Sequence, residues 1–74
     1  MKKTEIEKEL NTIRERIRMC RLRKGYSQEY MGQLLNISQY GYHKIENGKT
    51  KLHLENLLKI SAILGVNTKE LLDG

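Results

Sequence analysis

The stretch "YSQEYMGQLLNISQYGYHKIENG", residues 26–48, decides the fold because it holds the signals for two short helices and a tight turn. Ser27 and Ser38 each stand where a helix N-cap is expected, since a serine hydroxyl can accept a hydrogen bond from a free backbone N–H of the first turn. Between them, Asn36 tolerates the left-handed conformation that a tight turn requires. Gly48 then ends the second helix. The stretch therefore predicts two short helices, over residues 28–35 and 39–47.

A longer helix is predicted before this stretch. Apolar residues spaced 4, 3, 4 and 3 apart form one helical face there: Ile6, Leu10, Ile13, Ile17 and Cys20. We expect the helix to run to about Arg23, where two basic residues suit a helix C-terminus, and to end at Gly25.

The start of this helix is left open by two capping-box patterns: Thr4 with Glu7, and Thr12 with Glu15. We expect the core part of the helix to begin near Thr12. This divides the chain into an N-terminal helical extension over residues 1–11 and one domain over residues 12–74.

Two further helices are predicted towards the C-terminus. Apolar side chains recur at helical spacing from Leu54 to Leu64, and Gly65 ends that run. They are expected to form one broad apolar face: Leu54, Leu57, Leu58, Ile60, Ser61, Ile63 and Leu64. Asn67 with Glu70 then fits a capping pair for a last short helix, "TKELLD". Five helices with short connections indicate an all-α fold.

One side of the predicted helix over residues 39–47 carries only hydrogen-bonding side chains. At about 100° per residue, one continuous arc contains Gln39, Tyr40, His43, Lys44 and Asn47. Gly41, Tyr42 and Ile45 fill the opposite, inner arc, and Glu46 lies at its border. A side without carboxylates avoids repulsion from phosphates, and its Gln and Lys can pair with adenine and guanine in a major groove wide enough for a helix. We therefore predict that this side reads DNA bases.

Basic residues beside that helix favour the same partner. Lys and Arg outnumber the acids by 14 to 9, giving a formal net charge of +5 and an isoelectric point near 9.5. Such a bias suggests a polyanionic partner, most often nucleic acid. Lys49 and Lys51 follow the helix on a loop, and Gln28 lies in the first turn of the preceding helix, where free N–H groups favour an anion. These positions suit phosphate contacts.

Several other functions are not indicated. Cys20 is the only cysteine, so no disulfide can form within the chain, and a cytoplasmic location is expected. No stretch approaches the ~18 apolar residues of a membrane span, and no apolar core of a signal peptide follows the basic start. His43 and His53 fit no metal-ligand pattern, and no nucleophile stands beside a base partner. We expect neither an enzyme nor a metal or cofactor.

From about Ile13 to Leu72 the chain resembles the phage repressor/Cro-like, or XRE-type, helix-turn-helix family. The segments that carry the resemblance occur in family order: "KGYSQEYMGQLLNISQ", "HKIENGKTKL", "LLKISAILGV" and "ELL". The resemblance implies a compact five-helix, lambda-repressor-like domain whose third helix lies in the major groove of double-stranded DNA. It implies base contacts by Gln39, Tyr40 and Lys44, with His43 facing the bases or the backbone. The phosphate contacts that it implies are those of Gln28, Asn47, Lys49 and Lys51.

The resemblance also implies an ion pair between Arg21, late in the first helix, and Glu46. This pair would explain the lone acid of the third helix, because Glu46 would then hold Arg21 instead of meeting DNA. Four positions of this region depart from the family pattern. Gly32 replaces an Ala where two helices cross, Asn36 replaces the usual Gly of the turn, and Gly41 replaces a Thr or Ser. Tyr42 replaces a smaller aliphatic residue, so its hydroxyl needs a partner.

We predict a sequence-specific DNA-binding transcriptional regulator that acts as a homodimer on a palindromic operator, since two copies can address half-sites about 34 Å apart. The interface is expected at the last helix, through Leu71 or Leu72 with Ile63 or Leu64 nearby. The alternative interface is the N-terminal stripe of Ile6 and Leu10. Two other functions stay open: a protein-binding module such as the antitoxin of a toxin–antitoxin pair, and a non-specific or RNA-binding basic domain.

Overall fold

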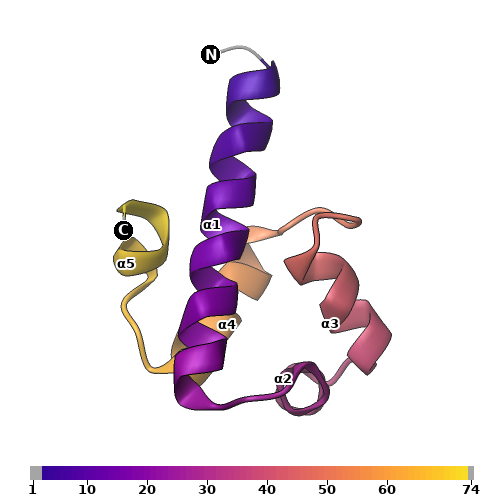
Figure 1. Ribbon diagram of the computed structural model, residues 1–74. Coiled ribbons are helices and arrows are strands. Elements are labelled where there is room, and N and C mark those ends of the chain that lie inside the picture. The colour runs from indigo at the N-terminus through magenta and orange to yellow at the C-terminus, as the bar shows by residue number, and fades with distance from the viewer. Residues whose placement is uncertain (1–2, 74) are drawn as a thin grey trace.

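Five helices joined by short turns make up residues 3–73, the part of the chain that this computed structural model describes (Figure 1). They are α1 Lys3–Lys24, α2 Gln28–Leu35, α3 Gln39–Glu46, α4 Leu54–Leu64 and α5 Thr68–Asp73. The predicted all-α fold is confirmed. Residues 1, 2 and 74, which belong to the predicted extension and domain, lie outside the described residues. Within residues 3–73, no helix is long and apolar enough to cross a membrane.

The serine caps predicted for α2 and α3 are confirmed. The Ser27 hydroxyl accepts a hydrogen bond from the Tyr30 N–H at 3.0 Å, and the Ser38 hydroxyl accepts one from the Gly41 N–H at 2.9 Å. Asn36 has a φ of 60°, in the left-handed region, and turns the chain between the two helices. Both capping bonds join residues three apart in the sequence, which is why the local sequence was enough to predict them.

The helix α1 is continuous over 22 residues and passes residue 12 without a break. Thr12 does not begin a helix, because its hydroxyl donates to the backbone oxygen of Lys8 at 3.0 Å, as a threonine inside a helix does. Of the two candidate starts, Thr4 is therefore the one close to the observed start. The first half of α1 extends beyond the other helices (Figure 1), and Ile6 on that half is 45% exposed.

All five helices contribute to the hydrophobic core, which consists of Ile17, Met31, Tyr42, Ile45, Leu57, Ile60, Leu64 and Leu71. Two residues of the apolar face predicted for α4 do not join the core: Leu54 is 69% exposed and Leu58 is 50% exposed. The reason is the placement of α4. It packs on α1, α2 and α5 with the side that carries Leu57, Ile60, Ser61 and Leu64, which leaves Leu54 and Leu58 outside the contact.

The short helix α5 is held by buried contacts, and this corrects one prediction. Leu64 and Leu71 are fully buried within the chain, so of the residues predicted for a dimer interface at the last helix only Leu72 and the half-buried Ile63 are accessible. Leu71 fixes α5 to the core, and Arg16 of α1 donates from Nη1 to the backbone oxygens of Leu71 and Leu72, at 3.0 and 2.7 Å. The side chain of Leu72 stays exposed.

The approach between α2 and the turn before α3 depends on Gly32. A Cβ atom added at Gly32 would lie 3.0 Å from the backbone oxygens of both Ile37 and Ser38. That separation is shorter than an ordinary contact between a carbon and an oxygen. The chain therefore approaches α2 more closely here than the alanine of the family pattern would permit without a shift of the backbone.

Candidate nucleic-acid interface

The helix α3 turns its inner arc into the core and its polar arc outward. Tyr42, Ile45 and Glu46 are buried. The five polar residues predicted to face outward lie on the other side of the helix. Gln39, Tyr40 and Asn47 are exposed, whereas His43 and Lys44 are half-buried. Within this helix, the only carboxylate therefore points into the protein, and the outward side presents amides, two rings and an ammonium group.

The side chains at the start of this outward side contact one another. The rings of Tyr40 and His43 are nearly parallel, with 17° between their planes and 6.3 Å between their centroids. The Lys44 Nζ atom lies 5.1 Å from the centroid of the Tyr40 ring, a cation–π contact. With Gln28 and Gln39, the two rings line a shallow hollow of about 420 Å³. The first residue of α2 and the outward side of α3 thus form one continuous surface.

Behind this surface, Arg21 and Glu46 form the ion pair that the family resemblance implies. Arg21 donates from Nε and Nη2 to the two oxygens of Glu46, at 2.9 and 2.8 Å, and the Glu46 side chain is only 1% exposed. The Tyr42 hydroxyl donates to Glu46 Oε2 at 2.6 Å. The carboxylate is thereby the hydrogen-bond partner that the tyrosine at this position needs.

The charge states in this network follow from its hydrogen bonds. Burial favours a neutral Glu46, but the hydrogen bonds from Arg21 and Tyr42 and the charge of Arg21 outweigh burial and lower the pKa of Glu46. The hydrogen bond to Glu46 raises the pKa of Arg21, while burial and then the bond to Glu46 raise the pKa of Tyr42. At neutral pH, Glu46 is therefore an ionised acceptor and Tyr42 a neutral donor.

Gln28 is drawn into the same network. Its Nε2 atom lies 3.4 Å from Glu46 Oε1, and its Oε1 atom lies 3.2 Å from His43 Nδ1. The residue expected at a phosphate is thus half-buried and bridges the buried carboxylate to a residue expected at a base. Asn47, Lys49 and Lys51, the other three phosphate candidates, are exposed where α3 ends and the loop begins.

Arg14 of α1 is a buried residue at this interface that the sequence reading overlooked. It donates from Nε to the backbone oxygen of Ile45 at 3.1 Å and from Nη2 to that of Thr50 at 3.3 Å. A cation placed at the carbonyl end of α3 is favourable, since the last carbonyls of a helix have no partner within it. Arg14 also packs against Gly48 of the loop.

The sequence did contain a signal for Arg14. It precedes Ile17 by three residues and Arg21 by seven, so all three lie on one face of α1, and they are the buried residues of that helix. A basic residue on a buried helical face indicates a carbonyl or carboxylate partner, since a buried charge needs one.

A capped pair of short helices, with an acid-free outward side on the second, defines a helix-turn-helix protein. The model of the helix-turn-helix family matches residues 17–71, so the chain belongs to this family, and the resemblance to its XRE-type members is confirmed. Over 60 residues the chain is 50% identical to YonR of Bacillus subtilis (strain 168), an SPbeta prophage-derived uncharacterized HTH-type transcriptional regulator.

The match with YonR covers 81% of this chain and 56% of that protein, so the chain spans about half the length of this relative. No solved structure matches the chain.

Proposed function

We propose that this chain is a sequence-specific DNA-binding regulator of transcription that reads the major groove with α3. The observation that carries the proposal is the orientation of α3. Its outward side offers hydrogen-bonding groups without a carboxylate, while Glu46 points inward and is neutralised by Arg21. The similarity to an HTH-type transcriptional regulator supports the same function.

The proposed contacts divide into two sets. Base contacts are assigned to the outward side of α3, namely to Gln39, Tyr40, His43 and Lys44. Phosphate contacts are assigned to the flanks of that side: Gln28, Asn47, Lys49 and Lys51. Base contacts give specificity and phosphate contacts give affinity for any DNA, so replacing Lys44 of the first set and Lys49 of the second set separates the two roles.

Replacing Lys44 with Ala is expected to weaken binding to the operator by roughly 1 to 3 kcal/mol and to blunt the base preference at one position. Replacing Lys49 with Ala is expected to weaken binding to all DNA about equally. It should also reduce, by about one, the magnitude of the slope of log affinity against log salt concentration. The operator is first obtained by selecting bound sites from random DNA. Affinities are then measured on that site and on a scrambled duplex over a range of salt concentrations.

These two variants are each other's control, because both remove one lysine near the end of α3. Direct reading by α3 is wrong if both variants lose specific and non-specific binding alike. An equal affinity of the wild-type chain for the selected and scrambled duplexes would favour the non-specific or RNA-binding alternative.

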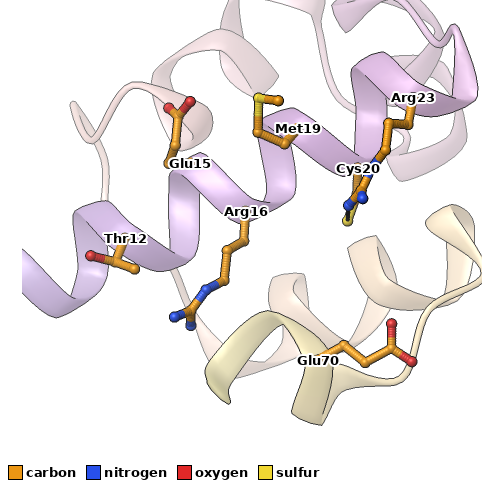
Figure 2. A pocket seen from close by; sticks show the side chains of 7 residues that line it. All are labelled: Thr12, Glu15, Arg16, Met19, Cys20, Arg23 and Glu70. Atoms are coloured by element: carbon orange, nitrogen blue, oxygen red, sulfur yellow. Dashed lines mark hydrogen bonds between the residues drawn. The ribbon is translucent and has the colours of Figure 1, made fainter. Parts of the chain in front are cut away.

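We also propose that the protein acts as a homodimer that pairs along a groove between α1 and α5. The groove has a volume of about 680 Å³ and is lined by Thr12, Glu15, Arg16, Met19, Cys20, Arg23 and Glu70 (Figure 2). Glu15, Met19 and Arg23 follow one another at intervals of four on α1. A second copy, antiparallel about a two-fold axis at Met19, would set each Glu15 opposite the other copy's Arg23.

Replacing Met19 with Glu is expected to weaken self-association about 10- to 100-fold, because it removes the apolar centre of this contact and sets two like charges together. Met19 is 46% exposed, so the fold should tolerate the change. Sedimentation velocity over a concentration series measures the effect. Leu58→Glu is the matched control, since Leu58 is 50% exposed but does not line the groove. Equal self-association of Met19→Glu and the wild type would exclude this interface.

A further inference from the structure

The hydrogen bonds that connect the buried Glu46 to the surface determine which ring nitrogen of His43 carries the proton. We propose that neutral His43 is protonated at Nδ1 and presents Nε2 as a hydrogen-bond acceptor. For DNA this means that His43 reads an exocyclic amino group, N6 of adenine or N4 of cytosine, and not guanine. The statement on DNA rests on the proposed function, whereas the position of the proton does not.

The first step concerns the orientation of the Gln28 amide. Glu46 is ionised, and both of its oxygens already accept hydrogen bonds from Arg21, with a further one from Tyr42. A carboxylate can only accept, so the Gln28 atom that faces Glu46 Oε1 at 3.4 Å must belong to the NH₂ group. The chemistry of Glu46 thus fixes which end of the Gln28 amide points in each direction.

The second step follows from that orientation. With its NH₂ group turned to Glu46, Gln28 presents its carbonyl oxygen to His43 Nδ1, at 3.2 Å. A carbonyl oxygen cannot donate, so a hydrogen bond at this position requires the proton on Nδ1. In a neutral imidazole the other nitrogen, Nε2, is then an acceptor.

Asn47 contacts the His43 ring without distinguishing its two nitrogens. Its Nδ2 atom lies 2.8 Å from His43 Nε2 and 3.0 Å from His43 Nδ1. An atom at nearly equal distances from the two ring nitrogens lies above the plane of the ring, out of line with the lone pair of Nε2, so the assignment of the proton depends on Gln28.

The consequence for DNA recognition depends on what each base presents in the major groove. Adenine and cytosine present amino groups there, whereas guanine presents only the acceptors N7 and O6. If His43 presents Nε2 as an acceptor, it can accept a hydrogen bond from the amino group of adenine or cytosine. At guanine, the lone pair of Nε2 would face the lone pairs of N7 or O6 and be repelled. Protonation at Nε2 would reverse this preference, so Gln28 acts on specificity through the proton of His43.

The position of the proton is tested in the free wild-type protein. Long-range ¹H–¹⁵N correlation spectra at about pH 8.5, above the ordinary histidine pKa, distinguish a protonated from an unprotonated ring nitrogen. We expect Nδ1 of His43 to be protonated and Nε2 unprotonated. His53 is the internal control, because it is exposed and makes no side-chain capping bond. Protonation of His43 at Nε2 in the wild type would overturn the proposal.

A variant tests the cause. Gln28→Leu removes the carbonyl acceptor, so His43 should lose its preference for Nδ1 and give a pattern like that of His53. Retention of the Nδ1 proton in this variant would show that Gln28 does not hold it there. Because the wild-type spectrum is informative by itself, the test does not depend on the folding of the variant.

The DNA consequence is tested on the selected operator. The base contacted by His43 is the position at which His43→Ala loses its preference in the same selection. We expect adenine or cytosine there, and about fivefold weaker binding when that base is replaced by its analogue without the amino group. A guanine at that position, or full affinity for the analogue, would refute the acceptor role. If no DNA is bound specifically, the proposed function fails, and the spectra alone decide where the proton lies.

Discussion

Replacing Arg21 with Ala is expected to lower the free energy of unfolding by about 3–5 kcal/mol, because it leaves the buried carboxylate of Glu46 without its charged partner. The Glu46 side chain is 1% exposed and cannot recover the loss by contact with water. A domain of 74 residues has a total stability of only about 4–11 kcal/mol, so much of it would be lost. Urea denaturation followed by circular dichroism measures the change.

The matched control is Arg18→Ala on the same helix. Arg18 pairs with Glu15 at 3.1 Å, but both side chains are at least half exposed, so we expect a loss below about 1 kcal/mol. Arg21→Lys keeps the positive charge but cannot donate to both oxygens of Glu46 as the guanidinium does. Its loss of unfolding free energy should lie between those of the two alanine variants, so the comparison stays informative if Arg21→Ala does not fold. Equal losses in Arg18→Ala and Arg21→Ala would contradict the role assigned to the buried pair.

The contribution of Glu46 to stability is expected to change with pH in opposite directions in the wild type and in Arg21→Ala. In the wild type the pKa of Glu46 is lowered, so the stability that Glu46 contributes is present above its ordinary value of 4.5 and is lost as the pH falls through the lowered pKa. In Arg21→Ala we expect burial to outweigh the remaining hydrogen bonds from Tyr42 and Gln28 and to raise the pKa of Glu46. Protonation then relieves the unpaired charge, so the deficit relative to the wild type should shrink as the pH falls from 7 towards about 4.5.

Replacing Arg14 with Ala is expected to cost about 2–3 kcal/mol of stability and also to weaken DNA binding. Arg14 bonds the carbonyl oxygen of Ile45 near the end of α3 and that of Thr50 in the loop, between Lys49 and Lys51. Without it, the end of α3 and both lysines lose their fixed position relative to α1. Stability is measured by urea denaturation, and affinity on the selected operator is measured at a temperature where the variant is folded.

Arg16→Ala separates the two effects. Arg16 also bonds backbone oxygens at the end of a helix, but that helix is α5, away from the proposed DNA surface. We expect Arg16→Ala to lose stability while it keeps its affinity for a single half-site. If Arg14→Ala loses no more half-site affinity than Arg16→Ala, then Arg14 is a stability residue without a role in positioning α3.

Features that depend on residues close together in the chain could be predicted from the sequence. The caps at Ser27 and Ser38, the left-handed Asn36 and the bounds of α2 and α4 all agree with the structure. The inward side of α3 was predicted as well, because helical spacing alone assigns Tyr42 and Ile45 to one arc. The family resemblance added the Arg21–Glu46 pair, whose members are 25 positions apart.

The predictions that failed concern apolar residues whose burial depends on which other helix packs against them. Leu54 and Leu58 have the spacing of a buried face, yet no other helix covers them. Leu64 and Leu71 were named as alternatives to Ile63 and Leu72 for contact with a second chain, although a domain this small needs Leu64 and Leu71 for its own core. An apolar residue at helical spacing shows which side of a helix it occupies, but not which element packs there.

By itself, the sequence determined the five helices, the serine caps of α2 and α3 and the side of α3 that faces outward, because those depend on backbone bonds and spacing within a few residues. Only the tertiary structure decided that Tyr42 donates to Glu46, that Gln28 bridges Glu46 to His43, and that Arg14 closes the end of α3. These contacts join separate helices or follow from burial, so their partners depend on how the helices pack. The residues of the surface proposed to meet DNA follow from the sequence of α3 alone. Which of its groups donate and which accept hydrogen bonds depends on the network of Glu46, Gln28 and His43, which forms only when the helices pack together.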